Sequence, residues 1–223
     1  MKIDIVTIFP NLFDGFISES LLARAQVKKL ITIKTHNLRK WTNDKHKTVD
    51  DRPYGGGVGM VLKVEPIYKA VSTLRAKGKE KRAKIRTILL SAKGRTFTQK
   101  DARRLSKYGQ LIFICGRYEG VDERVAKNVA DEEISIGNYV LFGGEVASMV
   151  VIEAVSRLIP GVVQKEESIK NESFSDREAK EKEYPQYTRP EVFKLGKKSL
   201  KVPDVLLSGN HKKIEEWRRR NTE

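Results

Sequence analysis

The chain has 223 residues, 39% hydrophobic and 33% charged, which predicts a globular protein with one large core and a small appendage. No apolar run approaches the roughly 20 residues of a membrane span, so a transmembrane protein is excluded. The net charge of +15 favours a polyanionic partner such as nucleic acid.

Short strand-like runs alternate with helical patterns over the first 160 residues. The predicted strands are Lys2–Phe9, Leu30–Thr35, Arg86–Ser91, Leu111–Cys115, Glu133–Ile136 and Tyr139–Leu141. Helices are expected at Leu12–Gln26, Glu65–Ala76, Thr98–Tyr108 and Val146–Ile159. Several strands are continuous apolar runs, as in parallel strands buried on both faces. The order predicts an α/β fold with a mainly parallel sheet and helices on both faces.

A change of composition divides the chain after residue 164. Residues 165–185 alternate charges of both signs and predict a flexible connector. Residues 186–223 form a small domain, predicted to be helical, that ends in an amphipathic helix at His211–Arg220. So short a segment buries little core alone, so we expect it to dock on the first domain, residues 1–164, or on a partner subunit.

Three glycine-bearing loops follow apolar runs: "LLSAKGR" (Leu89–Arg95), "CGRYEG" (Cys115–Gly120) and "ISIGNYVLFGGE" (Ile134–Glu145). In parallel sheets, ligands bind at the carboxyl ends of the strands, where these loops fall. None has the spacing of a P-loop or of a Gly-x-Gly-x-x-Gly motif. The loops therefore predict a cleft of backbone groups for a ligand with a purine and an amino-acid part.

Basic residues and a fourth glycine cluster suggest RNA contacts. Between Arg75 and Lys107 there are 13 basic residues and two acidic ones. A solvated lysine-rich surface is the alternative interpretation of that segment. In "DDRPYGGGVGM" (Asp50–Met60), Arg52 could contact phosphate and Tyr54 could stack on a base, although a flexible surface loop also fits.

Cysteine and histidine usage indicates neither a disulfide nor a structural metal site. The single cysteine, Cys115, lies in an apolar run and reads as a core residue, which fits a reducing cytoplasm. His36, His46 and His211 are scattered and do not form a zinc pattern. The amino-terminal "MKIDIVTIFP" reads as a first strand and not as a signal peptide.

Six stretches, in chain order and over nearly the whole chain, carry a family resemblance: "DDRPYGGGVGM", "CGRYEGVDERV", "SIGNYVLFGGE", "VSRLIPGV", "YPQYTRPEV" and "LLSGNH". Together they resemble the bacterial tRNA (guanine-N1-)-methyltransferases of the SPOUT class. The resemblance implies methyl transfer from S-adenosylmethionine to N1 of guanosine 37 of tRNA, in the cytoplasm. It also implies a deep trefoil knot towards the carboxyl side of the first domain, and a homodimer with shared active sites. No DNA or membrane partner is expected, and a requirement for Mg²⁺ stays open.

The resemblance also assigns residues. The implied cofactor pocket comprises Leu89, Leu90, Ser91, Gly116, Arg117, Tyr118, Glu119, Ser135, Ile136, Gly137, Tyr139, Leu141, Gly143 and Gly144. The implied catalytic residues are Arg157 and Glu172, the latter in "NESF" where the family has aspartate, with Asp176 as the second candidate base. Arg52, Tyr54, Arg189 and His211 are the expected RNA-binding residues, although a structural role for His211 is the simpler interpretation.

Two alternatives to tRNA methylation are open at the level of sequence. A related knotted methyltransferase could act on ribosomal RNA, against which the "DRPYGGG" and "YTRPEV" stretches argue. An RNA-binding protein that has lost catalysis could carry Glu172 in place of aspartate, against which the intact glycine loops argue. Binding of S-adenosylmethionine separates an enzyme from a pure RNA-binding protein.

Overall fold

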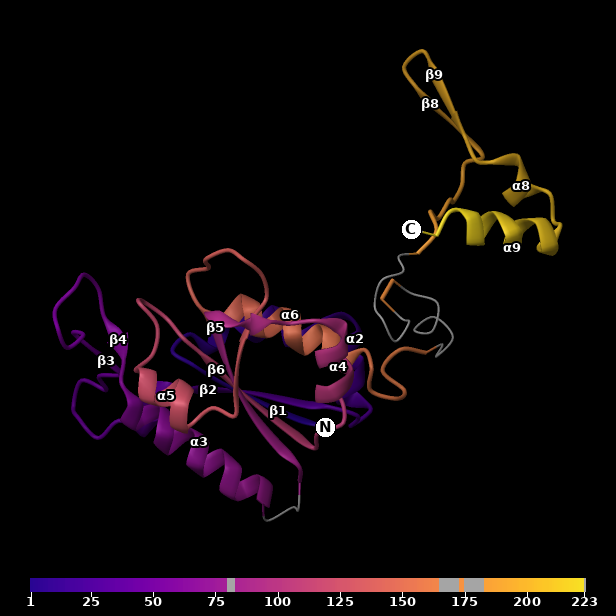
Figure 1. Cartoon of the computed structure of the whole chain (residues 1–223). Helices are drawn as coiled ribbons and strands as arrows, with labels where there is room; N and C mark the ends of the chain where they lie inside the picture. Colours follow the sequence, from indigo (N-terminus) through magenta and orange to yellow (C-terminus); the bar gives the residue numbers. More distant parts are fainter. Residues whose placement is uncertain (80–82, 165–172, 175–182, 223) are drawn as a thin grey trace. The chain divides into compact units, whose positions relative to one another are not determined.

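The computed structural model describes residues 1–79, 83–164, 173–174 and 183–222 (Figure 1). The chain divides into two compact units, Met1–Gln164 and Lys165–Glu223. Most of the predicted connector, residues 165–185, lies outside the described residues. Within the described residues, no helix has the length and apolar character needed to cross a membrane.

A five-stranded parallel sheet forms the centre of the first unit, with strand order β2-β1-β6-β5-β7. The strands are β1 (Lys2–Thr7), β2 (Thr32–Asn37), β5 (Ile85–Thr96), β6 (Gln110–Cys115) and β7 (Glu132–Ser135). Every residue of the middle strand β6 is buried. The predicted α/β fold with a mainly parallel sheet is confirmed.

Helices cover both faces of this sheet, as predicted (Figure 1). Along β6, Leu111, Phe113 and Cys115 face one hydrophobic cluster, and Ile112 and Ile114 face the other, because side chains alternate along a strand. The first cluster packs against α2 (Ser20–Val27), α4 (Gln99–Leu105) and α6 (Gly144–Ser156). The second packs against η2 (Leu38–Trp41), α3 (Val64–Lys79) and α5 (Glu123–Asn128).

Three predicted elements differ from the structure. The helix expected at Leu12–Gln26 is divided into η1 (Pro10–Phe13), α1 (Asp14–Ser18) and α2, because Glu19 adopts an extended conformation between two serines. The strand expected at Arg86–Ser91 continues to Thr96 past a shift of register. The strand expected at Tyr139–Leu141 is wrong: these residues lie in an irregular loop with no sheet partner.

The second unit mixes a hairpin with helices. Strands β8 (Val192–Leu195) and β9 (Lys198–Lys201) pair antiparallel around a turn at Gly196, whose φ is +60°. Helices α8 (Asp204–Leu207) and α9 (His211–Arg220) follow. The predicted helix His211–Arg220 is confirmed, but the expectation of a purely helical domain is wrong.

Candidate active site

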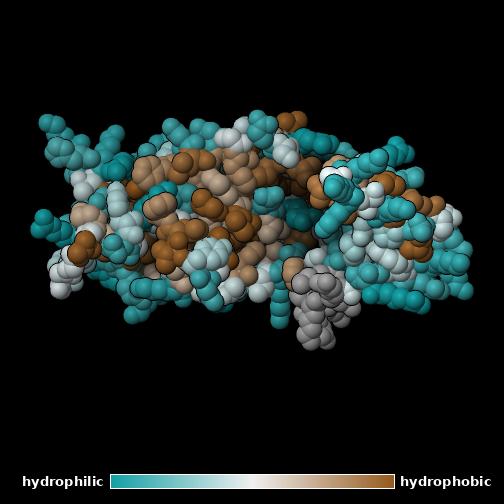
Figure 2. Space-filling view, turned by 90° about the horizontal axis from the view of Figure 1, so that it is seen from above, coloured by the Kyte–Doolittle hydropathy of each residue, from teal (hydrophilic) through white to brown (hydrophobic). Residues whose placement is uncertain are grey.

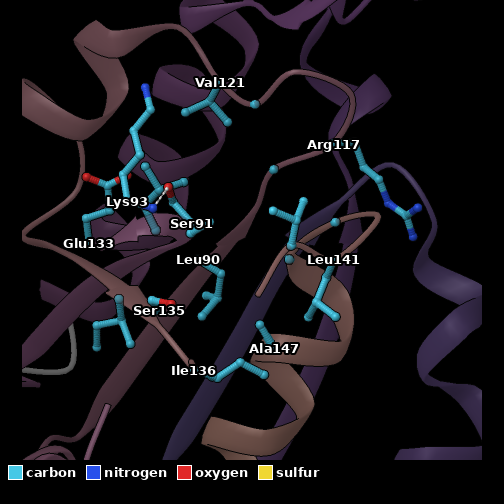
Figure 3. Close-up of a pocket in the computed structure, with 18 of the residues that line it drawn as sticks. Leu90, Ser91, Lys93, Arg117, Val121, Glu133, Ser135, Ile136, Leu141 and Ala147 are labelled. Atoms are coloured by element: carbon cyan, nitrogen blue, oxygen red, sulfur yellow. Dashed lines mark hydrogen bonds between the residues drawn. The ribbon is translucent and has the colours of Figure 1, made fainter. Parts of the chain in front are cut away.

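A pocket lies at the carboxyl ends of β6 and β7 and beside residues 89–93 of β5, where the three glycine-bearing stretches converge (Figure 3). The prediction of a loop at Leu89–Arg95 is wrong, because this stretch is part of strand β5. The three stretches are brought together because the three strands are parallel neighbours in the sheet. All fourteen residues predicted for the cofactor pocket line this one cavity: Leu89, Leu90, Ser91, Gly116, Arg117, Tyr118, Glu119, Ser135, Ile136, Gly137, Tyr139, Leu141, Gly143 and Gly144.

Glycine is required where α6 begins. The Gly144 amide donates a hydrogen bond to the Gly116 carbonyl (2.9 Å). A Cβ on Gly144 would lie 2.8 Å from the Cys115 Cα and 3.1 Å from the Gly116 amide nitrogen. A side chain there would collide with backbone, so only glycine lets the third loop pack against the second.

The pocket combines apolar walls with a few polar groups. Leu90, Ile136, Leu141 and Ala147 supply apolar surface around the cavity (Figure 3). The Ser135 hydroxyl donates to the Gly137 carbonyl (2.9 Å) and accepts from the Gly137 amide (3.2 Å), which fixes the start of the third loop. Such a lining suits a ligand with a flat apolar part and several hydrogen-bonding groups.

Three charged residues at the pocket were not predicted: Lys93, Glu123 and Glu133. Lys93 Nζ lies 3.9 Å from Glu123 Oε2, and the Lys93 amide donates to Ser91 Oγ (3.1 Å). Lys93 follows an apolar run in "LLSAKGR", so its place after a strand was the available signal. Nothing in the sequence separates Glu133 from the other surface carboxylates.

Arg117 borders the pocket, but its side chain makes its contacts elsewhere. Its side chain points away from the cavity (Figure 3), and its Nε donates to Glu145 Oε2 (2.8 Å). The guanidinium stacks on the Phe9 ring, 4.7 Å from the ring centre. Arg117 therefore borders the pocket through its backbone, which forms a bridge to Gly143.

Cys115 is a core residue, as predicted. Its side chain is buried, and its Sγ contacts Ser148 Oγ at 3.6 Å. Burial, and after it the nearby charge of Glu145, raises the pKa of the Cys115 thiol well above its usual range. The thiol stays protonated and is no nucleophile. Among the described residues, no group of three or more His, Cys, Asp or Glu is placed to hold a metal ion.

The fourth glycine loop is joined to the second glycine loop by backbone hydrogen bonds. It runs between the short strands β3 (Asp50–Asp51) and β4 (Val61–Leu62). The Glu119 amide donates to the Met60 carbonyl (3.0 Å), and the Leu62 amide donates to the Gly120 carbonyl (3.0 Å). Arg52 and Tyr54 are exposed on this loop, which is compatible with their predicted contacts to RNA.

Arg157 does not reach the pocket of its own chain. It follows the last residue of α6, whereas Gly143 and Gly144 lie at the start of this 13-residue helix. At 1.5 Å per residue the two ends are about 20 Å apart. Glu172 and Asp176 lie outside the described residues. Arg189 and His211 are exposed residues of the second unit, and His211 is the first residue of α9.

Four arginines of the basic segment from Arg75 to Lys107 pair with carboxylates. Arg75 pairs with Asp131, and Arg86, Arg95 and Arg104 pair with Glu132. Arg95 and Arg104 also pair with Asp101. These arginines link α3, β5 and α4 to Asp131, Glu132 and Asp101, so their first role is structural.

A parallel α/β sheet with glycine-bearing stretches around a pocket at one edge is typical of α/β proteins that bind a small ligand there. The chain belongs to the tRNA (guanine-1)-methyltransferase TrmD family, whose model matches residues 1–223. It is 54% identical over 222 residues to the tRNA (guanine-N(1)-)-methyltransferase of Carboxydothermus hydrogenoformans, covering 100% of this chain and 83% of the relative. The enzyme of the same description from Dictyoglomus turgidum is 54% identical over 220 residues, covering 99% and 84%. The predicted family is confirmed, and tRNA guanine-N1 methylation is its activity.

Proposed function

We propose that this chain transfers the methyl group of S-adenosylmethionine to N1 of guanosine 37 of tRNA, in the cytoplasm. The observation that carries the proposal is the convergence of fourteen residues, expected from the family resemblance, on one cavity. The family supports tRNA guanine as the substrate. Position 37 and the identity of the cofactor are the parts that require experiment.

The residues around the pocket fit S-adenosylmethionine. The apolar side chains of Leu90, Ile136 and Leu141 offer walls for an adenine ring. The absence of side chains at Gly143 and Gly144 lets the third loop pack tightly on Arg117, Glu145 and Cys115, and this packing forms one wall of the pocket. Exposed backbone groups and Ser91 suit a ribose and an amino acid. The bound cofactor would supply an electrophilic methyl group on a sulfonium centre.

The remaining chemistry falls to two side chains. Guanine N1 carries a proton at neutral pH, and Glu172 would accept it, with Asp176 as the alternative. A general base of this kind raises the reaction rate by about 10²–10⁴-fold. Negative charge then develops on O6, which the Arg157 guanidinium would stabilise. The target base must also leave the stack of the anticodon loop to reach these groups.

A homodimer with shared active sites is part of the proposal, and Arg157 supports it. Because α6 separates Arg157 from its own pocket by about 20 Å, an Arg157 that acts at a pocket must come from a second copy. An apolar face supports the same conclusion. Val146 and Val150, one turn apart on α6, are 56% and 44% exposed. Figure 2, seen from above Figure 1, shows hydrophobic side chains gathered on the upper side of the molecule, where α6 lies.

The test of the dimer is a substitution on α6. Val150→Glu should shift sedimentation from dimer to monomer and abolish methyl transfer, because a carboxylate would be buried without a partner. Tyr68→Glu, at an exposed position of α3 on the opposite face of the sheet, is the matched control and should leave the dimer intact. A wild-type chain that sediments as a monomer at micromolar concentration would remove the shared-site model.

The trefoil knot is also inferred. Its support is the close packing of the third glycine loop on the second: Gly144 bonds Gly116, and Gly143 bridges Arg117, although the two loops are separated by α5 and β7. A knot in this region would require such close packing of two loops that are distant in the sequence. Tracing the main chain in a crystal structure would decide whether α6 passes through a loop of the chain.

The test of the proposed function is methylation of transcribed tRNA. We expect N1-methylguanosine at position 37 of a transcript with guanosine there, and none in the matched transcript with adenosine 37. Equal methylation of both transcripts would contradict position 37, and methylation of ribosomal RNA alone would support the related knotted enzyme. Cofactor binding without any methyl transfer would support the alternative of an RNA-binding protein that has lost catalysis.

A further inference from the structure

A buried carboxylate lies directly behind the pocket, and no step above uses it. Glu145 is the second residue of α6 and is only 1% exposed. Its Oε1 accepts a hydrogen bond from Thr7 Oγ1 (2.7 Å), and its Oε2 accepts one from Arg117 Nε (2.8 Å). The carboxylate thus joins the end of β1, the loop after β6 and the start of α6.

Glu145 and Arg117 fill the space behind the third glycine loop. A Cβ on Gly143 would lie 2.4 Å from Arg117 Nε and 2.6 Å from Glu145 Oε2. On its other side, the Arg117 guanidinium rests on the Phe9 ring. The Gly143 backbone is therefore supported by this ion pair, and Gly144 beside it packs on Cys115 and Gly116.

Stability alone gives little reason for this arrangement. Burying an ion pair costs several kcal/mol of desolvation, and well-packed hydrophobic residues often serve folding equally well. An ion pair with a hydrogen bond also fixes the orientation of both side chains, because Nε and Oε2 form that bond only in a narrow range of geometry. The Arg117 side chain is 20% exposed and the Glu145 side chain is 1% exposed, so water screens the ion pair weakly.

We propose that Glu145 is a positioning residue for the cofactor pocket. Through Arg117 it holds the Gly143–Gly144 turn against the loop after β6, and so sets the separation of two pocket walls. The inference rests on the proposed function, because its readout is the affinity for S-adenosylmethionine. Glu145 itself touches neither the cofactor nor the reacting atoms in this account.

The test compares two buried carboxylates that both pair with arginine. Glu145→Gln keeps size and leaves Arg117 without its counter-charge; we expect cofactor affinity, measured by calorimetry, to fall about tenfold or more. Glu132→Gln is the matched control, because Glu132 is 8% exposed, pairs with Arg86, Arg95 and Arg104, and does not line the pocket. It should lower the melting temperature and leave cofactor affinity within about twofold.

Arg117→Lys is a second test of the same ion pair, and it remains informative if Glu145→Gln fails to fold. It keeps the positive charge but loses the Nε geometry, so affinity should fall as for Glu145→Gln. The double variant should bind no more weakly than the worse single variant, because both changes break one interaction. Unchanged affinity in either single variant, or equal losses in Glu145→Gln and Glu132→Gln, would overturn the positioning role. A wild-type chain that binds no cofactor would instead overturn the proposed function.

Discussion

The two units of the chain are built in opposite ways. Met1–Gln164 buries two hydrophobic clusters, one on each face of its sheet. In Lys165–Glu223, no described residue is buried, and even the hydrophobic side chains of the hairpin β8–β9 are exposed. The first unit therefore has the hydrophobic core that stabilises both its fold and the pocket, whereas the second unit has little core of its own.

Local contacts hold the second unit together. The Tyr187 and Trp217 rings meet edge to face, with centres 6.2 Å apart, and the Arg218 guanidinium lies 4.9 Å from the centre of the Tyr184 ring. Asn210 Oδ1 caps α9 by accepting from the Lys213 amide (3.2 Å). Each such contact is worth on the order of 1 kcal/mol.

Removal of the second unit should have the largest effect on tRNA methylation. A chain that ends at Gln164 should unfold cooperatively and still bind S-adenosylmethionine, because both hydrophobic clusters lie within it. Its methylation of tRNA should fall by about 10³-fold or more, since it lacks Glu172 and α9. Single-turnover methyl transfer measures the loss. Full-length Glu172→Gln is the control and should lose about 10²-fold with tRNA affinity retained. Methylation of tRNA by the shortened chain at the wild-type rate would contradict the claim that the second unit is required for catalysis.

Gly144→Ala tests the scaffold within the first unit. The new Cβ would meet the Cys115 backbone at 2.8 Å, which forces the third loop away from the second. Cofactor affinity should fall by about 100-fold, measured by calorimetry. Gly15→Ala is the control, because its Cβ meets nothing within 4 Å. Normal cofactor binding by Gly144→Ala would mean that the pocket is elsewhere.

Acid should destabilise the first unit through Asp101. Burial opposes ionisation there, but hydrogen bonds from Arg95, Thr98 and Arg104 outweigh it and lower the pKa of Asp101 from 3.8 to about 2. The folded state therefore binds the proton less tightly than the unfolded state. This contribution, on the order of 1–2 kcal/mol, is present above pH 4 and is lost as the pH falls towards 2.

Urea unfolding of the shortened chain between pH 7 and pH 3 measures this effect. Asp101→Asn should be less stable than the wild type at pH 7, and the difference should shrink as the pH falls towards 3. Asp14→Asn changes an exposed carboxylate and should leave the curve unchanged. A pH-independent effect of Asp101→Asn would show that its charge is not what stabilises the fold.

Salt dependence of tRNA binding gives the smallest effect. Replacing Arg220, exposed at the end of α9, with alanine should make the log–log slope less negative by about 0.7–0.9, the value for one lost phosphate contact. Arg86→Ala should leave the slope unchanged, because Arg86 Nε is held by Glu132 Oε1 at 2.8 Å. The reverse pattern would assign RNA binding to the segment from Arg75 to Lys107.

The sequence predicts the pocket better than the details around it. Apolar runs followed by Gly116 and Gly137 mark the parallel strands β6 and β7, which end in ligand-binding loops, and strands that are parallel in one sheet bring such loops to one edge. The direction of the Arg117 side chain was not predictable. Its partner Glu145 is 28 residues away, and only the packing of α6 brings them together.

The errors in secondary structure also have physical reasons. The loop residues Tyr139–Leu141 look like a strand because they are apolar, but they border a pocket instead of joining the sheet. The hairpin β8–β9 was missed because its side chains have no buried face to impose alternation. Its signal was the Gly196-Lys197 turn shortly after Val192 and Phe193.

Hydrogen exchange of the whole chain, with and without S-adenosylmethionine, tests most directly the claim that the first unit alone carries the cofactor pocket. Slower exchange is expected in the three glycine-bearing stretches at residues 89–95, 115–120 and 134–145, which border the pocket. The hairpin β8–β9 and helix α9 should exchange at the same rate with and without cofactor. Protection confined to residues 192–220, or no protection in the three stretches, would contradict the account.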